Sequence, residues 1–105
     1  AVFVTSGAAT KCLAYWGPYS VSKAALDALA RTWAAEAAET PLRVNLLNPG
    51  PIRTRMRAIA MPGEDPETLP LPETLASAAM SLFAPDLSEN GAVFDFLDGA
   101  IHRRD

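Results

Sequence analysis

Cysteine and histidine are nearly absent from the 105 residues, with Cys12 and His102 as the only ones. A single cysteine excludes an internal disulfide and is typical of proteins from a reducing compartment. Because the chain has no second cysteine or histidine, we expect an unreactive thiol at Cys12 and a solvent-exposed side chain at His102. The sequence therefore predicts no metal site.

Long hydrophobic runs and an excess of positive charge are also lacking. No apolar stretch approaches the roughly 20 residues that cross a bilayer, and the start AVFVTS has no basic flank of a signal peptide. Nine basic side chains against twelve acidic ones give a formal net charge of −3, which provides no electrostatic footprint for nucleic acid. We therefore expect a cytoplasmic protein without nucleic-acid or membrane partners.

Half of the residues are hydrophobic, and their spacing alternates between strand and helix patterns. Short apolar runs that end at turn residues predict buried strands at residues 1–5, 42–47 and 92–97. Segments rich in alanine and other helix formers predict helices at residues 18–38, 54–60 and 72–84. This alternation predicts an α/β fold with a parallel sheet of about three strands and crossover helices.

The predicted helix at residues 18–38 is polar along one stripe only, formed by Lys23, Asp27 and Arg31. The rest of its surface is apolar or small, so the helix needs cover on more than one side. A sheet can supply one cover and a second copy of the chain the other. We therefore expect a homo-oligomer that associates through this helix.

The first predicted strand opens the sequence without a preceding helix. A buried parallel strand needs neighbours on both sides, and only three strands are predicted. We therefore expect residues 1–105 to be the later part of a larger domain.

Tyr19 and Lys23 stand four residues apart at the start of helix 18–38, within the stretch GPYSVSK. This spacing places both side chains on the same helix face. A phenol retains its proton at neutral pH, and a nearby ammonium group favours the phenolate. The pair is therefore either an ordinary surface pair or a device for proton transfer.

Two further features follow the ends of predicted strands, namely Ser6 and the turn Asn48-Pro49-Gly50. In open parallel sheets, ligands bind outside the carboxyl ends of the strands. The Ser6 hydroxyl can hydrogen-bond a substrate oxygen that carries developing charge, although Thr5 beside it offers a second hydroxyl. With Tyr19 and Lys23 at the same rim, the set predicts proton transfer to or from an alcohol or carbonyl oxygen.

These motifs resemble those of the classical short-chain dehydrogenase/reductase family. Members of that family are NAD(P)-dependent oxidoreductases with a Rossmann-type doubly wound parallel sheet. Tyr19 and Lys23 match the family's Tyr-x-x-x-Lys element, and Ser6 lies thirteen residues before Tyr19, within the usual spacing of the catalytic serine. The segment NPGPIRT at residues 48–54 is similar to the family's segment after the next strand. The resemblance implies that Tyr19 is the acid/base, that Lys23 promotes its ionisation and holds the nicotinamide ribose, and that Ser6 orients the substrate oxygen.

The resemblance further implies NAD or NADP as cofactor and a small alcohol or carbonyl compound as substrate. It assigns cofactor binding to Tyr19, Lys23, Pro49, Gly50, Ile52 and Thr54. The family's glycine-rich phosphate turn and its catalytic asparagine have no counterpart in the sequence. Residues 1–105 are therefore expected to be the C-terminal part of one Rossmann-type domain, with the N-terminal dinucleotide-binding half absent.

Two other interpretations compete with this one. A half-domain without the glycine-rich turn could act as a non-catalytic interaction or oligomerisation module. The extended branch of the same superfamily, which acts on sugar nucleotides, also uses Tyr-x-x-x-Lys. The short distance from the turn at Asn48 to the last residue argues against that branch.

Four prolines and a glycine between residues 55 and 72 exclude one continuous helix there. Several apolar side chains of this excursion belong either to the core or to a mobile lid over a substrate: Met56, Ile59, Met61 and Leu69. Long excursions at a ligand rim are often functional, which favours the lid.

Overall fold

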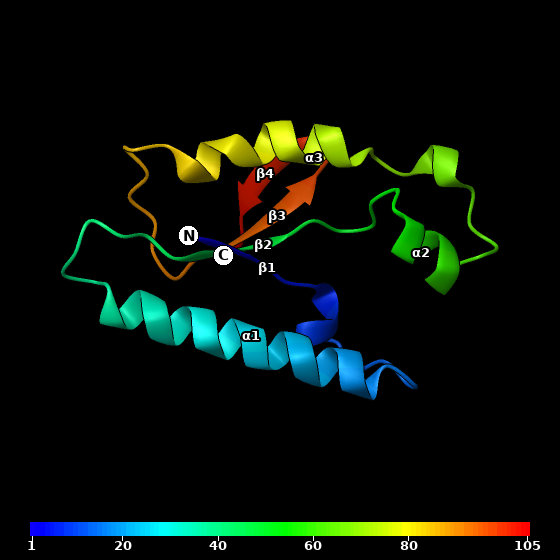
Figure 1. Ribbon diagram of the computed structural model, residues 1–105, viewed down its shortest axis with the longest axis horizontal. Coiled ribbons are helices and arrows are strands. Elements are labelled where there is room, and N and C mark those ends of the chain that lie inside the picture. The colour runs from blue at the N-terminus through cyan, green and yellow to red at the C-terminus, as the bar shows by residue number, and fades with distance from the viewer.

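A four-stranded sheet forms the centre of the molecule, as the computed structural model of residues 1–105 shows (Figure 1). The strands lie in the order β1 (Val2–Val4), β2 (Asn45–Asn48), β3 (Val93–Leu97) and β4 (Ala100–Arg103). The first three are parallel, and β4 runs antiparallel to β3. The helices are α1 (Gly17–Glu36), α2 (Arg55–Ala60) and α3 (Pro72–Ala79), with 3-10 turns at Gly7–Ala9, Pro66–Thr68 and Met80–Phe83. The predicted α/β fold is confirmed.

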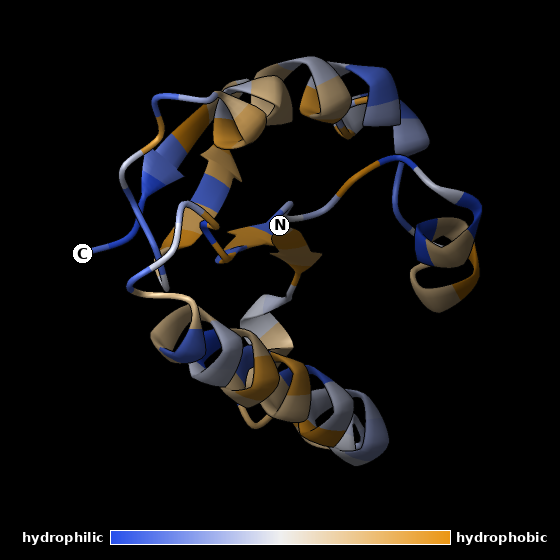
Figure 2. Cartoon of the chain, turned by 60° about the vertical axis from the view of Figure 1, so that its left-hand side comes forward, coloured by the Kyte–Doolittle hydropathy of each residue, from blue (hydrophilic) through white to orange (hydrophobic).

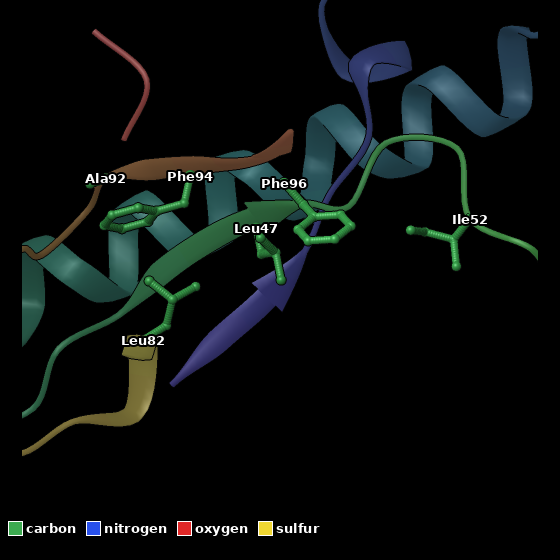
Figure 3. Close-up of a cluster of buried hydrophobic side chains, with 6 residues drawn as sticks. All are labelled: Leu47, Ile52, Leu82, Ala92, Phe94 and Phe96. Atoms are coloured by element: carbon green, nitrogen blue, oxygen red, sulfur yellow. The ribbon is translucent and has the colours of Figure 1, made fainter. Parts of the chain in front are cut away.

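Alternate residues of β2 point to opposite faces of the sheet, and each face carries its own helix. Leu46 packs beneath α1 against Ala30 and Ala34. On the other face, side chains from β2, β3, the segments next to these strands and the turn after α3 form a second cluster (Figure 3). Its members are Leu47, Ile52, Leu82, Ala92, Phe94 and Phe96. The result is a three-layer arrangement, with hydrophobic residues in the strands and also along α1 (Figure 2). None of the helices is both long and apolar enough to cross a membrane.

Within residues 1–105, the first strand is not fully buried, in contrast to the prediction. β1 lies at one edge of the sheet and pairs with β2 alone. Phe3 packs toward the cluster beneath α1, whereas Val4 is 50% exposed. An apolar run shows that a segment favours a strand, but it does not show whether that strand has one neighbour or two.

Strand β4 was not predicted from the sequence. A tight turn at Asp98 and Gly99 reverses the chain, and both residues have positive φ, at 53° and 77°. Asp-Gly pairs favour such two-residue hairpin turns, so this signal was present in the sequence. His102 is exposed as expected, but it lies on the strand, opposite Asp95.

Two asparagine side chains fasten the segment before β3 to the rest of the fold. Asn90 Oδ1 accepts from the N–H of Val44 at 2.9 Å, and Asn90 Nδ2 donates to the carbonyl of Ala34 at 2.8 Å. Asn45 is buried, and its Oδ1 accepts from the N–H of Ala92 at 3.0 Å. These amides satisfy backbone groups that would otherwise be buried without partners. They hold α1, β2 and the start of β3 in register.

Candidate active site

Ser6 lies two residues after the end of β1 and caps the 3-10 turn that follows. Its backbone is extended, and its Oγ accepts a hydrogen bond from the N–H of Ala8 at 3.2 Å. Serine and threonine favour this capping position because their oxygen satisfies a free N–H group. The Ser6 hydroxyl proton is not used in this contact, so the side chain can still donate to a bound oxygen.

Thr5, the alternative hydroxyl, is already engaged. It is only 3% exposed, and its Oγ1 donates to the Asp27 carboxylate on α1. This contact explains why α1 carries a carboxylate at Asp27: the side chain binds the segment after β1. Between the two hydroxyls, Ser6 is therefore the one that remains available.

Tyr19 and Lys23 occupy the first turns of α1, as the sequence predicted. Pro18 stands in the first turn, where the N–H that it lacks would have no helical partner. The Lys23 Nζ lies 5.8 Å from the centre of the Tyr19 ring and donates to the carbonyl of Val4 at 3.1 Å. The Tyr19 ring packs edge-on against Trp16, with 5.9 Å between ring centres.

The structure thus brings Ser6, Tyr19 and Lys23 to the carboxyl end of β1. No hydrogen bond joins any two of these side chains; Ser6 caps its own turn, and Lys23 donates to the carbonyl of Val4. An ammonium group has three donors, so Lys23 has two left after its contact with Val4. The arrangement combines a phenol, a cation and a free hydroxyl proton at one rim.

The Asn48-Pro49-Gly50 turn begins at the last residue of β2, at the carboxyl end of the parallel strands. Asn48 Oδ1 accepts from the N–H of Gly50 at 3.1 Å, which closes the turn. Gly50 has φ of 65°, a left-handed conformation that residues with a side chain rarely adopt. The sequence-predicted turn is therefore present, with an exposed glycine that lets another molecule approach the backbone.

Ile52 is buried in the core, whereas Thr54 is exposed at the start of α2. Ile52 is 7% exposed, and its side chain belongs to the cluster with Leu47 and Phe96, so it offers mainly backbone atoms to a ligand (Figure 3). Thr54 is exposed and caps α2, where its Oγ1 accepts from the N–H of Arg57 at 3.1 Å. The Thr54 hydroxyl proton remains available.

Two arginines fold the excursion between β2 and α3 back on itself. Arg53 Nε donates to the carbonyl of Pro66 at 2.8 Å. Arg57 donates to both carboxylate oxygens of Glu64, at 2.8 and 3.0 Å. Met56 and Ile59 are 68% and 73% exposed on α2. These two residues are therefore not part of the core, which leaves the lid as the interpretation for them.

The Arg57–Glu64 contact should make the excursion sensitive to acid. The hydrogen bond from Arg57 lowers the pKa of the Glu64 carboxyl, and desolvation offsets this only in part. A carboxyl with a lowered pKa stabilises the folded form above its ordinary value of about 4.3, and this contribution is lost as the pH falls through the lowered value. We expect NMR relaxation of residues 61–65 to show greater mobility once the pH falls well below that ordinary value.

Glu64→Gln should show that mobility already at neutral pH and lose the dependence on acid. Glu67→Gln is the matched control, because Glu67 is 81% exposed at the side chain and 3.7 Å from Arg53. A Glu64→Gln variant as rigid as the wild type at neutral pH would contradict the role of this contact.

Comparison with known proteins decides the family. Residues 1–65, more than half of the chain, match the sequence profile described as short chain dehydrogenase. The chain belongs to the short chain dehydrogenase family. The uncharacterized oxidoreductase YciK of Escherichia coli (strain K12) is 37% identical over 99 residues, which is 93% of this chain and 39% of YciK.

Solved structures of other short chain dehydrogenases share the fold. One from Salmonella enterica serovar Typhi has a TM-score of 0.85 at 38% identity, over 90% of this chain and 39% of that one. One from Escherichia coli CFT073, complexed with NADPH, has a TM-score of 0.75 at 36% identity, over 90% and 39%. The chain therefore spans about two-fifths of the length of these short chain dehydrogenases.

Proposed function

We propose that these residues belong to an NAD(P)-dependent oxidoreductase that transfers a hydride between a nicotinamide cofactor and an alcohol or carbonyl compound. The observation that carries this proposal is the gathering of Ser6, Tyr19 and Lys23 at the end of β1, beside the turn that follows β2. It is supported by membership of the short chain dehydrogenase family and by the NADPH complex of a relative.

Each residue has a distinct role in the proposal. Tyr19 passes a proton to the oxygen of a carbonyl substrate, or takes it from an alcohol in the reverse direction. The Lys23 ammonium supplies a positive charge 5.8 Å from the centre of the Tyr19 ring. Ser6 donates its hydroxyl proton to the substrate oxygen and stabilises the charge that develops there. A bound nicotinamide would supply or accept the hydride.

The residues present fit the nicotinamide end of such a cofactor. Lys23 keeps two donors for ribose hydroxyl groups, and Gly50 presents backbone without a side chain. Pro49, Ile52 and Thr54 extend this surface, through backbone atoms in the case of Ile52. We further propose that residues 1–105 form the C-terminal part of one Rossmann-type domain. The excursion at 53–70 then forms a lid beside the substrate.

The test is a hydride-transfer assay on the full-length protein. Purified protein is mixed with NADH or NADPH and a panel of ketones, aldehydes and diketones, and cofactor oxidation is followed by absorbance. Diketones belong in the panel because benzil reductase of Bacillus subtilis is 30% identical over 90% of this chain. We expect turnover with at least one carbonyl compound. Absence of binding to both cofactors would refute the proposal.

A second candidate is a non-catalytic oligomerisation module. The outer side of α1 favours association, because Val21 and Leu29 are 70% and 58% exposed there. We propose that two copies pair through α1, whichever function holds. Sedimentation distinguishes the cases: a stable assembly that binds no nicotinamide cofactor supports the module, and a strict monomer refutes the pairing. The cytoplasm is the proposed compartment, on the ground of the single cysteine.

A further inference from the structure

The side-chain amide of Asn48 stabilises the Asn48-Pro49-Gly50 turn through both of its ends. One end of this amide, Oδ1, accepts from the N–H of Gly50 at 3.1 Å. The other end, Nδ2, donates to Asp95 Oδ1 at 3.2 Å. Asp95 is the register partner of Asn48 on β3. The turn is therefore connected through a single side chain to the neighbouring strand.

Asp95 is itself oriented by Arg104, which follows β4. Arg104 Nε donates to Asp95 Oδ2 at 3.0 Å, and Arg104 Nη2 donates to Oδ1. The backbone N–H of Arg104 also bonds to the carbonyl of Val93 at 2.8 Å, which fixes this segment against β3. The Arg104 guanidinium holds the pKa of the Asp95 carboxyl below its usual range, and Asn48 and His102 act in the same direction. Asp95 is therefore a carboxylate at neutral pH.

A carboxylate imposes a direction on the amide beside it. The two ends of an asparagine amide are similar in shape, but one donates hydrogen bonds and the other accepts them. An ionised Asp95 only accepts, so it holds the Nδ2 of Asn48 toward itself. The Oδ1 is then directed at the N–H of Gly50, which stabilises the left-handed conformation of that glycine.

We propose that Asp95 is a positioning residue for the nicotinamide end of the cofactor, acting through Asn48 on the Pro49-Gly50 turn. This inference rests on the proposed function, in which the nicotinamide lies against that turn. Arg104 contributes to the same positioning, because it orients the carboxylate of Asp95. Asp95 on β3 and Arg104 after β4 thereby contribute to the site, although the proposal places neither of them in contact with the cofactor.

The first test compares two ligands on the full-length protein. Asp95→Leu removes the acceptor at similar side-chain size, and Asp86→Leu makes the same change at an exposed carboxylate as the control. The dissociation constant of the nicotinamide cofactor should rise about tenfold in Asp95→Leu, the effect of one lost hydrogen bond. ADP-ribose, which lacks the nicotinamide, should bind as to the wild type. Equal weakening of both ligands would show a merely structural role and overturn the inference.

The second test needs no cofactor. Hydrogen exchange at the N–H of Gly50 should accelerate in Asp95→Leu and, less strongly, in Arg104→Gln, where the contact between Asn48 and Asp95 remains. Unchanged exchange in both variants overturns the inference. Accelerated exchange in a protein that binds neither NADH nor NADPH refutes the proposed function, and with it the cofactor role of Asp95, while the link from Asp95 to the turn stands.

Discussion

Replacing Tyr19 by phenylalanine should lower kcat by about 10²- to 10⁴-fold, the usual contribution of a positioned general acid or base. The substitution removes one oxygen and keeps the ring, so the edge-on packing against Trp16 is retained. Affinity for the nicotinamide cofactor should change far less, because Lys23 and the turn at Gly50 remain. Steady-state kinetics with the best carbonyl substrate, together with a cofactor titration, separates the two effects.

Tyr15→Phe is the matched control for this experiment. Tyr15 lies four residues before Tyr19, is fully exposed and makes no side-chain hydrogen bond. The same loss of one hydroxyl there should leave kcat within a factor of about two, as expected for a surface position. Turnover by Tyr19→Phe at the wild-type rate would remove Tyr19 from the mechanism and would count against the role of Lys23 as well.

Leu46→Ala should lower the free energy of unfolding by about 2–5 kcal/mol, the range for a buried leucine truncated in a core. Leu46 is 1% exposed in the central strand β2 and packs against Ala30 and Ala34. Those alanines carry only methyl groups, which cannot fill the space that the leucine leaves. The variant should therefore lie toward the upper part of the range. Urea unfolding followed by circular dichroism measures the change.

Leu13→Ala serves as the stability control, since Leu13 is 54% exposed in the loop before α1. It should alter the free energy of unfolding by no more than about 0.5 kcal/mol. Equal losses from the two substitutions would mean that the packing of α1 on β2 does not carry the stability assigned to it.

Features that depend on neighbours along the chain could be predicted from the sequence. The positions of Tyr19 and Lys23 on one helix face follow from helical spacing, and the turn at Gly50 follows from its residue types. The whole range of α1 was predicted to within two residues. Ser6 was located because a strand end is marked by the glycine that follows it. Its role, like that of Tyr19, stays a prediction.

The contacts that could not be predicted join residues remote in sequence. Thr5 meets Asp27, and Asn48 meets Asp95, only because the strands and α1 take one particular register. No local pattern encodes that register between segments separated by 22 and 47 residues. Arg104 had no predicted role because β4 was missed, and with it the strand that carries the arginine to Asp95.

The excursion between β2 and α3 is tied mainly to itself, by Arg53 to Pro66 and by Arg57 to Glu64. A segment closed by its own side chains can be lengthened, shortened or exchanged with little effect on the scaffold beneath it. Under the proposed role of the excursion as a lid, substrate preference could change between relatives while the scaffold keeps its fold. Chimeras that swap residues 53–70 between family members offer a direct route to altered specificity.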